Sequence, residues 1–187
     1  MKKTLLAAVT AIALGVTAHG QGQIDFNNTT SGAITAQGGG FAGAPFQVSL
    51  YWVAGAFVGT ADALISSGTY FAANAPVLGS GPLTEPNQSN GAGIFFGGVI
   101  NIPGTSAGTY TFVAVAYSGA ASYSAALANP VSWVGNSAPF TVTLVTGATP
   151  PNTTIVPTFM VVPVPEPSSF ALAGLGLAGL LIFRRRK

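Results

Sequence analysis

Apolar residues recur at the spacing of β-strands through the middle of the chain. The strongest runs are residues 46–53, 99–102, 109–117 and 140–145, and the weaker ones are residues 23–26, 63–65, 76–78 and 93–96. Residues 140–145 alternate apolar side chains with Thr, and a period of two is typical of a strand that buries one face. Gly, Pro, Asn and Ser separate the runs, which predicts turns between them. A short helix is favoured only at residues 120–128.

Seven or eight short strands joined by turns predict an all-β fold. We expect a single β-sandwich-like domain over residues 21–146. The sequence Ser-Ser-Gly-Thr-Tyr at 66–70 is similar to Ser-Ala-Gly-Thr-Tyr at 106–110. Because a repeat fold needs at least three copies, we interpret these two segments as similar turns that lead into strands.

Residues 147–163 differ in composition from this predicted domain. They contain Pro150, Pro151, Pro157 and Pro163, together with several Thr residues. This composition predicts a stiff, extended stalk that lifts the domain off a membrane. Residues 160–162 are apolar enough to add one final strand.

The charged residues are few, and the basic ones lie only at the two ends. Charged residues make up 5% of the 187, against about 25% in a typical soluble domain. All six Lys and Arg residues lie at positions 2–3 and 184–187, and the acidic residues are Asp25, Asp62, Glu85 and Glu166. The region between the ends is therefore acidic, although the pI of the whole chain is 9.2. This argues against nucleic acid as a partner, because its binding requires Lys and Arg to neutralise phosphates.

The N-terminus has the pattern of a secretory signal peptide. Lys2 and Lys3 form a basic region, residues 5–16 are apolar, and small residues follow as far as Gly20. We expect cleavage after Ala18 or Gly20, which assigns residues 1–20 to the signal peptide and makes the secretion translocon a partner.

The C-terminus, residues 164–187, combines three parts in order. Pro165-Glu166-Pro167 comes first, the uncharged apolar run 170–183 follows, and Arg184-Arg185-Arg186-Lys187 ends the chain. We expect the run to form a transmembrane helix. It is shorter than the roughly 30 Å hydrocarbon core, so local thinning and the long Arg side chains must close the gap. Because Lys and Arg remain on the cytoplasmic side, the chain between the two basic ends is expected to be exported.

This tail resembles the PEP-CTERM sorting signal of Gram-negative bacteria. The resemblance implies a sorting and processing motif at Pro165, Glu166 and Pro167, and a cytoplasmic basic anchor at Arg184, Arg185, Arg186 and Lys187. It also implies an exosortase as partner, a membrane-embedded transpeptidase-like protease that cuts near the motif and releases or re-attaches the rest of the chain. The tail would thus sit transiently in the inner membrane before the protein reaches the cell surface or the extracellular space.

The side chains available for catalysis or metal binding are few. His19, the only histidine, lies at the signal-peptide boundary, and Cys is absent. Common Ser-His and Cys-His nucleophile systems, zinc sites and disulfides are therefore unsupported. Asp25, Asn27 and Asn28 offer oxygen ligands for calcium but lack the spacing of an EF-hand. We expect no enzyme, no metal and no cofactor.

These observations together predict a cell-surface or extracellular-matrix protein, as in a biofilm, with a structural or adhesive role. One alternative is a carbohydrate-binding module that acts on exopolysaccharide by stacking sugars on Trp52 or Trp133, although aromatic residues in strand-like runs are more often core. Another alternative is a self-assembling β-rich matrix protein, because low charge and high strand propensity favour edge-to-edge pairing of sheets.

Overall fold

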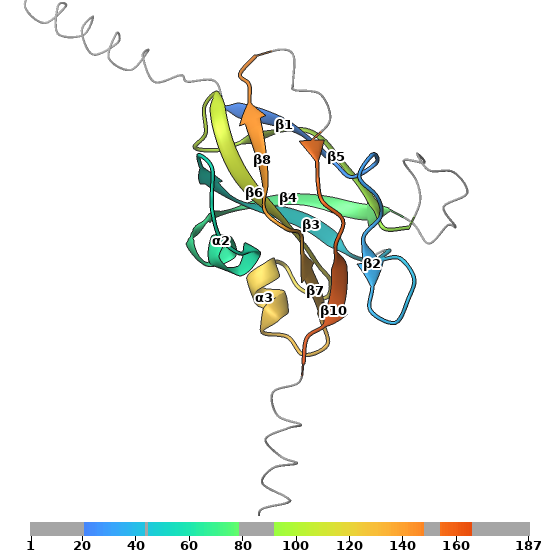
Figure 1. The fold of residues 1–187 in the computed structure, drawn as a ribbon. Helices are drawn as coiled ribbons and strands as arrows, with labels where there is room; N and C mark the ends of the chain where they lie inside the picture. The colour runs from blue at the N-terminus through green and yellow to red at the C-terminus, as the bar shows by residue number, and fades with distance from the viewer. Residues whose placement is uncertain (1–20, 44, 79–91, 148–153, 166–187) are drawn as a thin grey trace, which may run out of the picture.

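The computed structural model describes residues 21–43, 45–78, 92–147 and 154–165, and most of them lie in β-strands (Figure 1). The strands are β1 (Gly22–Asn27), β2 (Thr35–Ala36), β3 (Gln47–Ala54), β4 (Thr69–Leu78), β5 (Ile94–Ile102), β6 (Gly108–Tyr117), β7 (Trp133–Asn136), β8 (Phe140–Leu144), β9 (Thr154–Ile155) and β10 (Met160–Pro163). The helices are α2 (Ala61–Ser67) and α3 (Tyr123–Leu127). The all-β prediction is confirmed.

Most strands lie where the apolar runs predict them. The runs at 46–53, 109–117 and 140–145 correspond to β3, β6 and β8. The two segments that contain Gly-Thr-Tyr lead into β4 and β6, as predicted. The strand predicted at 63–65 is wrong, because these residues lie in α2, which Thr60 caps by accepting a hydrogen bond from the Ala63 N–H at 3.3 Å.

The strands form one hydrogen-bonded path in the order β2-β10-β7-β6-β3-β4-β5-β1-β9. The strand β8 pairs with the first half of β6, and β7 pairs with its second half. The Gln23 N–H donates to the Val145 carbonyl at 2.9 Å, which ties β1 to the end of β8. The sheet therefore curls until strands from its two halves meet, as Figure 1 shows for β1 and β8.

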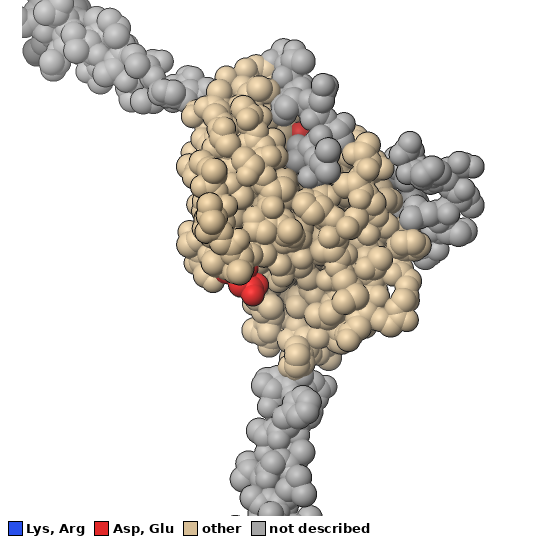
Figure 2. Space-filling model, viewed as in Figure 1, with Lys and Arg blue, Asp and Glu red and all other residues tan. Residues whose placement is uncertain are grey.

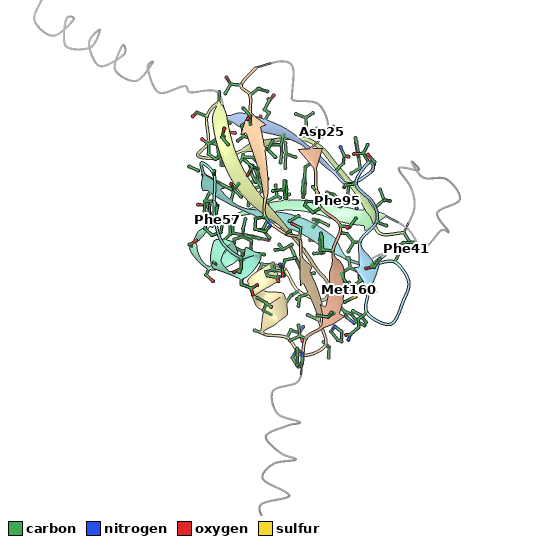
Figure 3. The ribbon with its side chains drawn as sticks, in the orientation of Figure 1. Asp25, Phe41, Phe57, Phe95 and Met160 are labelled. Atoms are coloured by element: carbon green, nitrogen blue, oxygen red, sulfur yellow. The ribbon has the colours of Figure 1, made fainter. Side chains whose placement is uncertain are left out.

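The main core fills the space inside this curl. Leu50 of β3 and Phe112 of β6 face Phe26 of β1 and Phe95 of β5, and all four are fully buried. The Phe26 and Phe95 rings lie 4.7 Å apart between centroids, in a tilted arrangement. Figure 3 shows Phe95 pointing into the interior. Because side chains alternate along β3 and β6, every second residue of these strands points into this core and packs against the other half of the sheet.

The two helices cover the opposite face of β3 and β6. Leu64 of α2 and Tyr123 of α3 pack there against a second buried cluster that contains Tyr51, Val113 and Tyr117. Because β6 is covered on both faces, its residues 110–117 are all buried. This double burial accounts for the nearly continuous apolar sequence of β6.

Residues 154–163, predicted as part of an extended stalk, belong to the folded domain. The strand β9 pairs in parallel with β1, and β10 pairs with both β7 and β2. Val156 and Val161 are buried in the main core. Gly135 of β7 lets β10 approach, since a Cβ there would collide with the Met160 carbonyl. The stalk prediction is wrong here because Pro163 lies beyond the residues of β10 that pair with β2, so this end of β10 is an edge, where proline is tolerated.

Several predictions fall outside the described residues. They include the signal peptide, residues 148–153 of the predicted stalk, and the transmembrane helix predicted at 170–183. Within the part of the chain that the structure describes, no helix has the length and hydropathy of a membrane span.

Candidate processing site and candidate ligand-binding residues

The last described contacts of the folded domain are made by Val164, directly before the predicted sorting motif. The Val164 N–H donates to the Ser132 carbonyl at 2.9 Å, and its side chain packs against the cluster beneath the helices. One residue earlier, Pro163 pairs with Trp133 in the ladder between β10 and β7. The next residue, Pro165, is exposed. The described contacts between domain and tail therefore stop one residue before the motif.

Proline makes this end of the domain abrupt. Pro163 and Pro165 have no N–H, so Val164 supplies the only backbone donor among these three residues. Once that donor is bound to Ser132, Pro165 cannot extend the ladder between β10 and β7. Proline also favours an extended backbone at the residue before it. The sequence thus favours an extended backbone at Val164, directly before the predicted motif.

Residues 163–187 match the PEP-CTERM protein-sorting motif. The chain carries a PEP-CTERM sorting signal. The resemblance drawn from Pro165-Glu166-Pro167, the apolar run and the basic cluster is confirmed, and it is consistent with an exosortase substrate. Glu166, Pro167 and the basic residues Arg184 to Lys187 lie outside the described residues. No curated protein and no solved structure matches the chain.

The PEP-CTERM signal overlaps the fold by two residues, Pro163 and Val164. Pro163 belongs both to β10 and to the matched motif, and Val164 and Pro165 follow it. Sorting signal and domain therefore meet without an intervening linker. The sequence did not reveal this junction, because the prolines of residues 147–163 concealed β9, and the partners of the strand predicted at residues 160–162 could not be inferred from local sequence.

The two candidate sugar-stacking residues lie at opposite ends of the domain. Trp52 is half-buried on β3 opposite Phe112, and its ring meets Tyr110 edge-on with centroids 5.5 Å apart. Trp133 is half-buried at the start of β7, and its backbone N–H donates to Ser118 Oγ at 3.3 Å. Phe112 and Ser118 are six residues apart on one extended segment, or about 20 Å. The two Trp side chains therefore do not form one stacking surface.

Two of the residues that could offer oxygen ligands for calcium, Asn27 and Asn28, form hydrogen bonds within the fold instead. The Asn28 side chain is buried and donates to the carbonyls of Gly32 and Gly93, both at 2.9 Å. Its Oδ1 accepts the Phe95 N–H at 2.7 Å, while Asn27 Oδ1 accepts from both the N–H and the hydroxyl of Thr29. Asp25 lies on β1 opposite Val99. Within the described residues, no group of three or more His, Cys, Asp or Glu side chains is gathered that could hold a metal ion.

A cluster of tyrosines beneath the helices was not anticipated from the sequence. The Tyr117 hydroxyl lies 3.3 Å from that of Tyr70 and 3.4 Å from Ser49 Oγ. Burial, followed by the charges of Asp62 and Tyr51, raises the pKa of Tyr123 from 10.0 to about 12. Burial is also the largest cause that raises the pKa of Tyr70 to about 12. The cluster therefore favours the neutral phenols, which pack between the helices and the sheet. The alternation of side chains along β3 and β6 puts Tyr51 and Tyr117 on one face, and this pattern could have indicated the cluster from the sequence.

The most exposed aromatic side chains in the described residues are not Trp52 and Trp133 but two phenylalanines. Phe41 is 45% exposed and Phe96 57%. Phe41 and Met160 both pair with Thr35 of β2, and Figure 3 shows them at the same edge of the molecule. Figure 2 shows a surface with small acidic areas and no basic side chain on the face in view. Charge therefore offers little for ligand binding on this face.

Proposed function

We propose that this protein is exported, held at the membrane by its PEP-CTERM tail, cut there by an exosortase, and then acts structurally or adhesively at the cell surface or in the extracellular matrix. The observation that carries the proposal is the junction at Val164. The last described contacts of the packed domain lie there, and the sorting motif follows at once. A cut within or beyond the motif would therefore leave every described strand in place.

The chemistry of the domain supports a role without catalysis. Residues 21–163 contain three carboxylates, at Asp25, Asp62 and Glu85, and neither His nor Cys. Asp25 lies on β1 and Asp62 in the first turn of α2, so they belong to different elements. General acid–base and nucleophilic mechanisms need groups within hydrogen-bond reach of one another.

Replacement of the motif acid tests the sorting step. We expect Glu166→Ala to reduce processing in cells that contain an exosortase, because it removes the acid between the two prolines. Glu85→Ala is the matched control, since it removes the same side chain outside the motif. Intact mass of the protein from membrane and extracellular fractions would show which variants lose the basic tail. Full processing of Glu166→Ala, or equal loss in both variants, would contradict the proposed role of the motif.

A deletion strain tests the structural or adhesive role. We expect such cells to lose cohesion or matrix material, and the wild-type chain to restore it. Glu166→Ala should restore less, because its product remains in the membrane. If cells without the protein keep normal cohesion and matrix, the structural role would be refuted while the sorting step would stand.

A further inference from the structure

Two exposed apolar residues lie beside the point where the chain leaves the domain. Leu127, the last residue of α3, is 48% exposed, and Val131, in the turn between α3 and β7, is 77% exposed. Val131 directly precedes Ser132, whose carbonyl accepts the Val164 N–H. The turn and the exit of the tail are therefore side by side.

The turn holds these apolar side chains outward on a fixed backbone. The Asn129 N–H donates to the Ala126 carbonyl at 3.0 Å, and the Ser132 N–H donates to the Asn129 carbonyl at 3.0 Å. The Asn129 side chain adds bonds at 3.2 Å to the Gly119 carbonyl and from the Val131 N–H. Because Asn129 fixes both sides of the turn, Val131 cannot fold back onto the domain without breaking these bonds.

The length of chain after Val164 limits how far this end can be from a membrane. Five residues, 165–169, separate Val164 from the apolar run that begins at Phe170. A fully extended chain spans at most about 3.6 Å per residue, so this segment reaches about 20 Å. The polar interface of one leaflet takes up roughly 5–8 Å of that reach. A tail in the membrane therefore keeps the exit end of the domain close to the lipid surface.

The composition of this region fits lipid rather than a charged partner. No charged residue occurs between Glu85 and Glu166. Attraction to anionic lipid requires clustered Lys and Arg, whereas apolar side chains insert into the interface by burying area. Contact by this end of the domain would therefore depend on apolar insertion.

We propose that the turn between α3 and β7, with Leu127 and Val131, rests in the interface of the lipid bilayer while the tail is inserted. This inference builds on the membrane tethering in the proposed function. Two attachments, the tail and the turn, fix the orientation of the domain. The motif is thereby held at the membrane surface, where a membrane-embedded protease acts.

A fluorescent label at Val131 tests this contact, with Val58 as the matched control. The chain has no Cys, so Val131→Cys and Val58→Cys each create one site for an environment-sensitive label. Val58 is also exposed, at 100%, but its loop follows Gly55, which bonds to Thr109. Thr109 and Ser118, the latter bonded to Trp133, are nine residues apart, or about 30 Å. The full-length labelled chain would be reconstituted into phosphatidylcholine vesicles with and without brominated lipid.

We expect the label at position 131 to emit at shorter wavelength in vesicles and to be quenched by brominated lipid, and the label at position 58 to do neither. High salt should leave this difference unchanged, because the contact is apolar. The proposal would be overturned if the chain sediments with the vesicles while both labels report water, or if both are quenched equally. A chain that does not sediment with vesicles would overturn the tail anchoring itself, and the contact with it.

Discussion

At the scale of single residues, Asn28 stabilises the connection between β1 and β5. Its buried side chain donates to the carbonyls of Gly32 and Gly93 and accepts the Phe95 N–H, and of these three groups the Gly93 carbonyl also accepts a second bond, from the Ile34 N–H. Removing such a side chain leaves buried polar groups without partners, at about 1–3 kcal/mol each when they cannot find others.

We expect Asn28→Ala to lower the free energy of unfolding by about 3 kcal/mol. Asn101→Ala is the control, because the Asn101 side chain is exposed and accepts a single exposed bond, from Gln23 Nε2. That change should cost no more than about 0.5 kcal/mol. Urea denaturation of both variants measures the difference, and equal losses would refute the role given to Asn28.

The buried hydroxyls of Ser132 and Ser137 differ in their bonding. Ser137 Oγ accepts the Ala114 N–H at 3.0 Å and donates to the Ala138 carbonyl at 2.8 Å. Ser132 Oγ has no hydrogen-bond partner among the described residues. We expect Ser137→Ala to lower the free energy of unfolding by about 1–2 kcal/mol, and Ser132→Ala to leave it unchanged or raise it slightly. Chemical denaturation distinguishes them, and a larger loss for Ser132→Ala would contradict the assignment.

Sequence reasoning at this scale identified residue types but not their partners. Asn27 and Asn28 were considered as calcium ligands because amide oxygens bind that ion. Their oxygens are instead used by backbone and side-chain groups of Thr29 and Phe95. Phe95 is 67 positions from Asn28, and no local pattern could show that bond.

At the scale of elements, β10 is the last strand of the described domain and attaches its C-terminal end to β2 and β7. Val161 is fully buried in the main core, while β10 itself is only four residues long. The sequence allowed a final strand at residues 160–162 but did not predict its partners. Those partners, β2 and β7, are set by the curl of the sheet and by Gly135, which are properties of the whole fold.

We expect Val161→Ala to lower the free energy of unfolding by about 2 kcal/mol, because it leaves a cavity in the core. The same change at the exposed Val131 should have little effect on stability. Limited proteolysis should also cleave residues 154–164 faster in Val161→Ala. If protease resistance and stability are unchanged, β10 does not contribute to the core as described.

The tyrosines beneath α2 and α3 predict a loss of stability at alkaline pH. In the folded protein the pKa of Tyr123 is about 12, against 10.0 for the ordinary side chain. Below pH 10 the phenol is neutral in both states, so its stabilisation is complete. Between pH 10 and 12 the unfolded chain ionises first, and the free energy of unfolding falls. Tyr123→Phe should reduce this fall in denaturation curves measured across that range, and an unchanged pH dependence would refute the assignment.

At the scale of the whole molecule, the tail determines the sign of the charge. Arg184, Arg185, Arg186 and Lys187 are the only basic residues beyond Lys3. After removal of the signal peptide and the tail, the chain keeps acidic side chains but no Lys or Arg. A nearly uncharged, faintly acidic domain lacks long-range attraction to nucleic acid or to anionic lipid.

We expect processing to move the isoelectric point from the basic to the acidic range. The unprocessed chain has a pI of 9.2, and isoelectric focusing of cell fractions measures the change. Glu166→Ala should remain largely in the basic form, because it retains the tail. If the extracellular protein focuses at basic pH, it has kept the tail, and the proposed processing is wrong.

The parallel pairing of β1 with β9 brings together two segments that are far apart in the sequence. Phe26 and Thr154 are partners although they lie about 130 positions apart, and pairings of such separation form slowly because a long loop must close first. A chain that is synthesised and exported from its N-terminus holds β1 without its partners until β5 and β9 have followed. The edge of the sheet formed by β1 and β9 is therefore among the last parts of the described fold that can close.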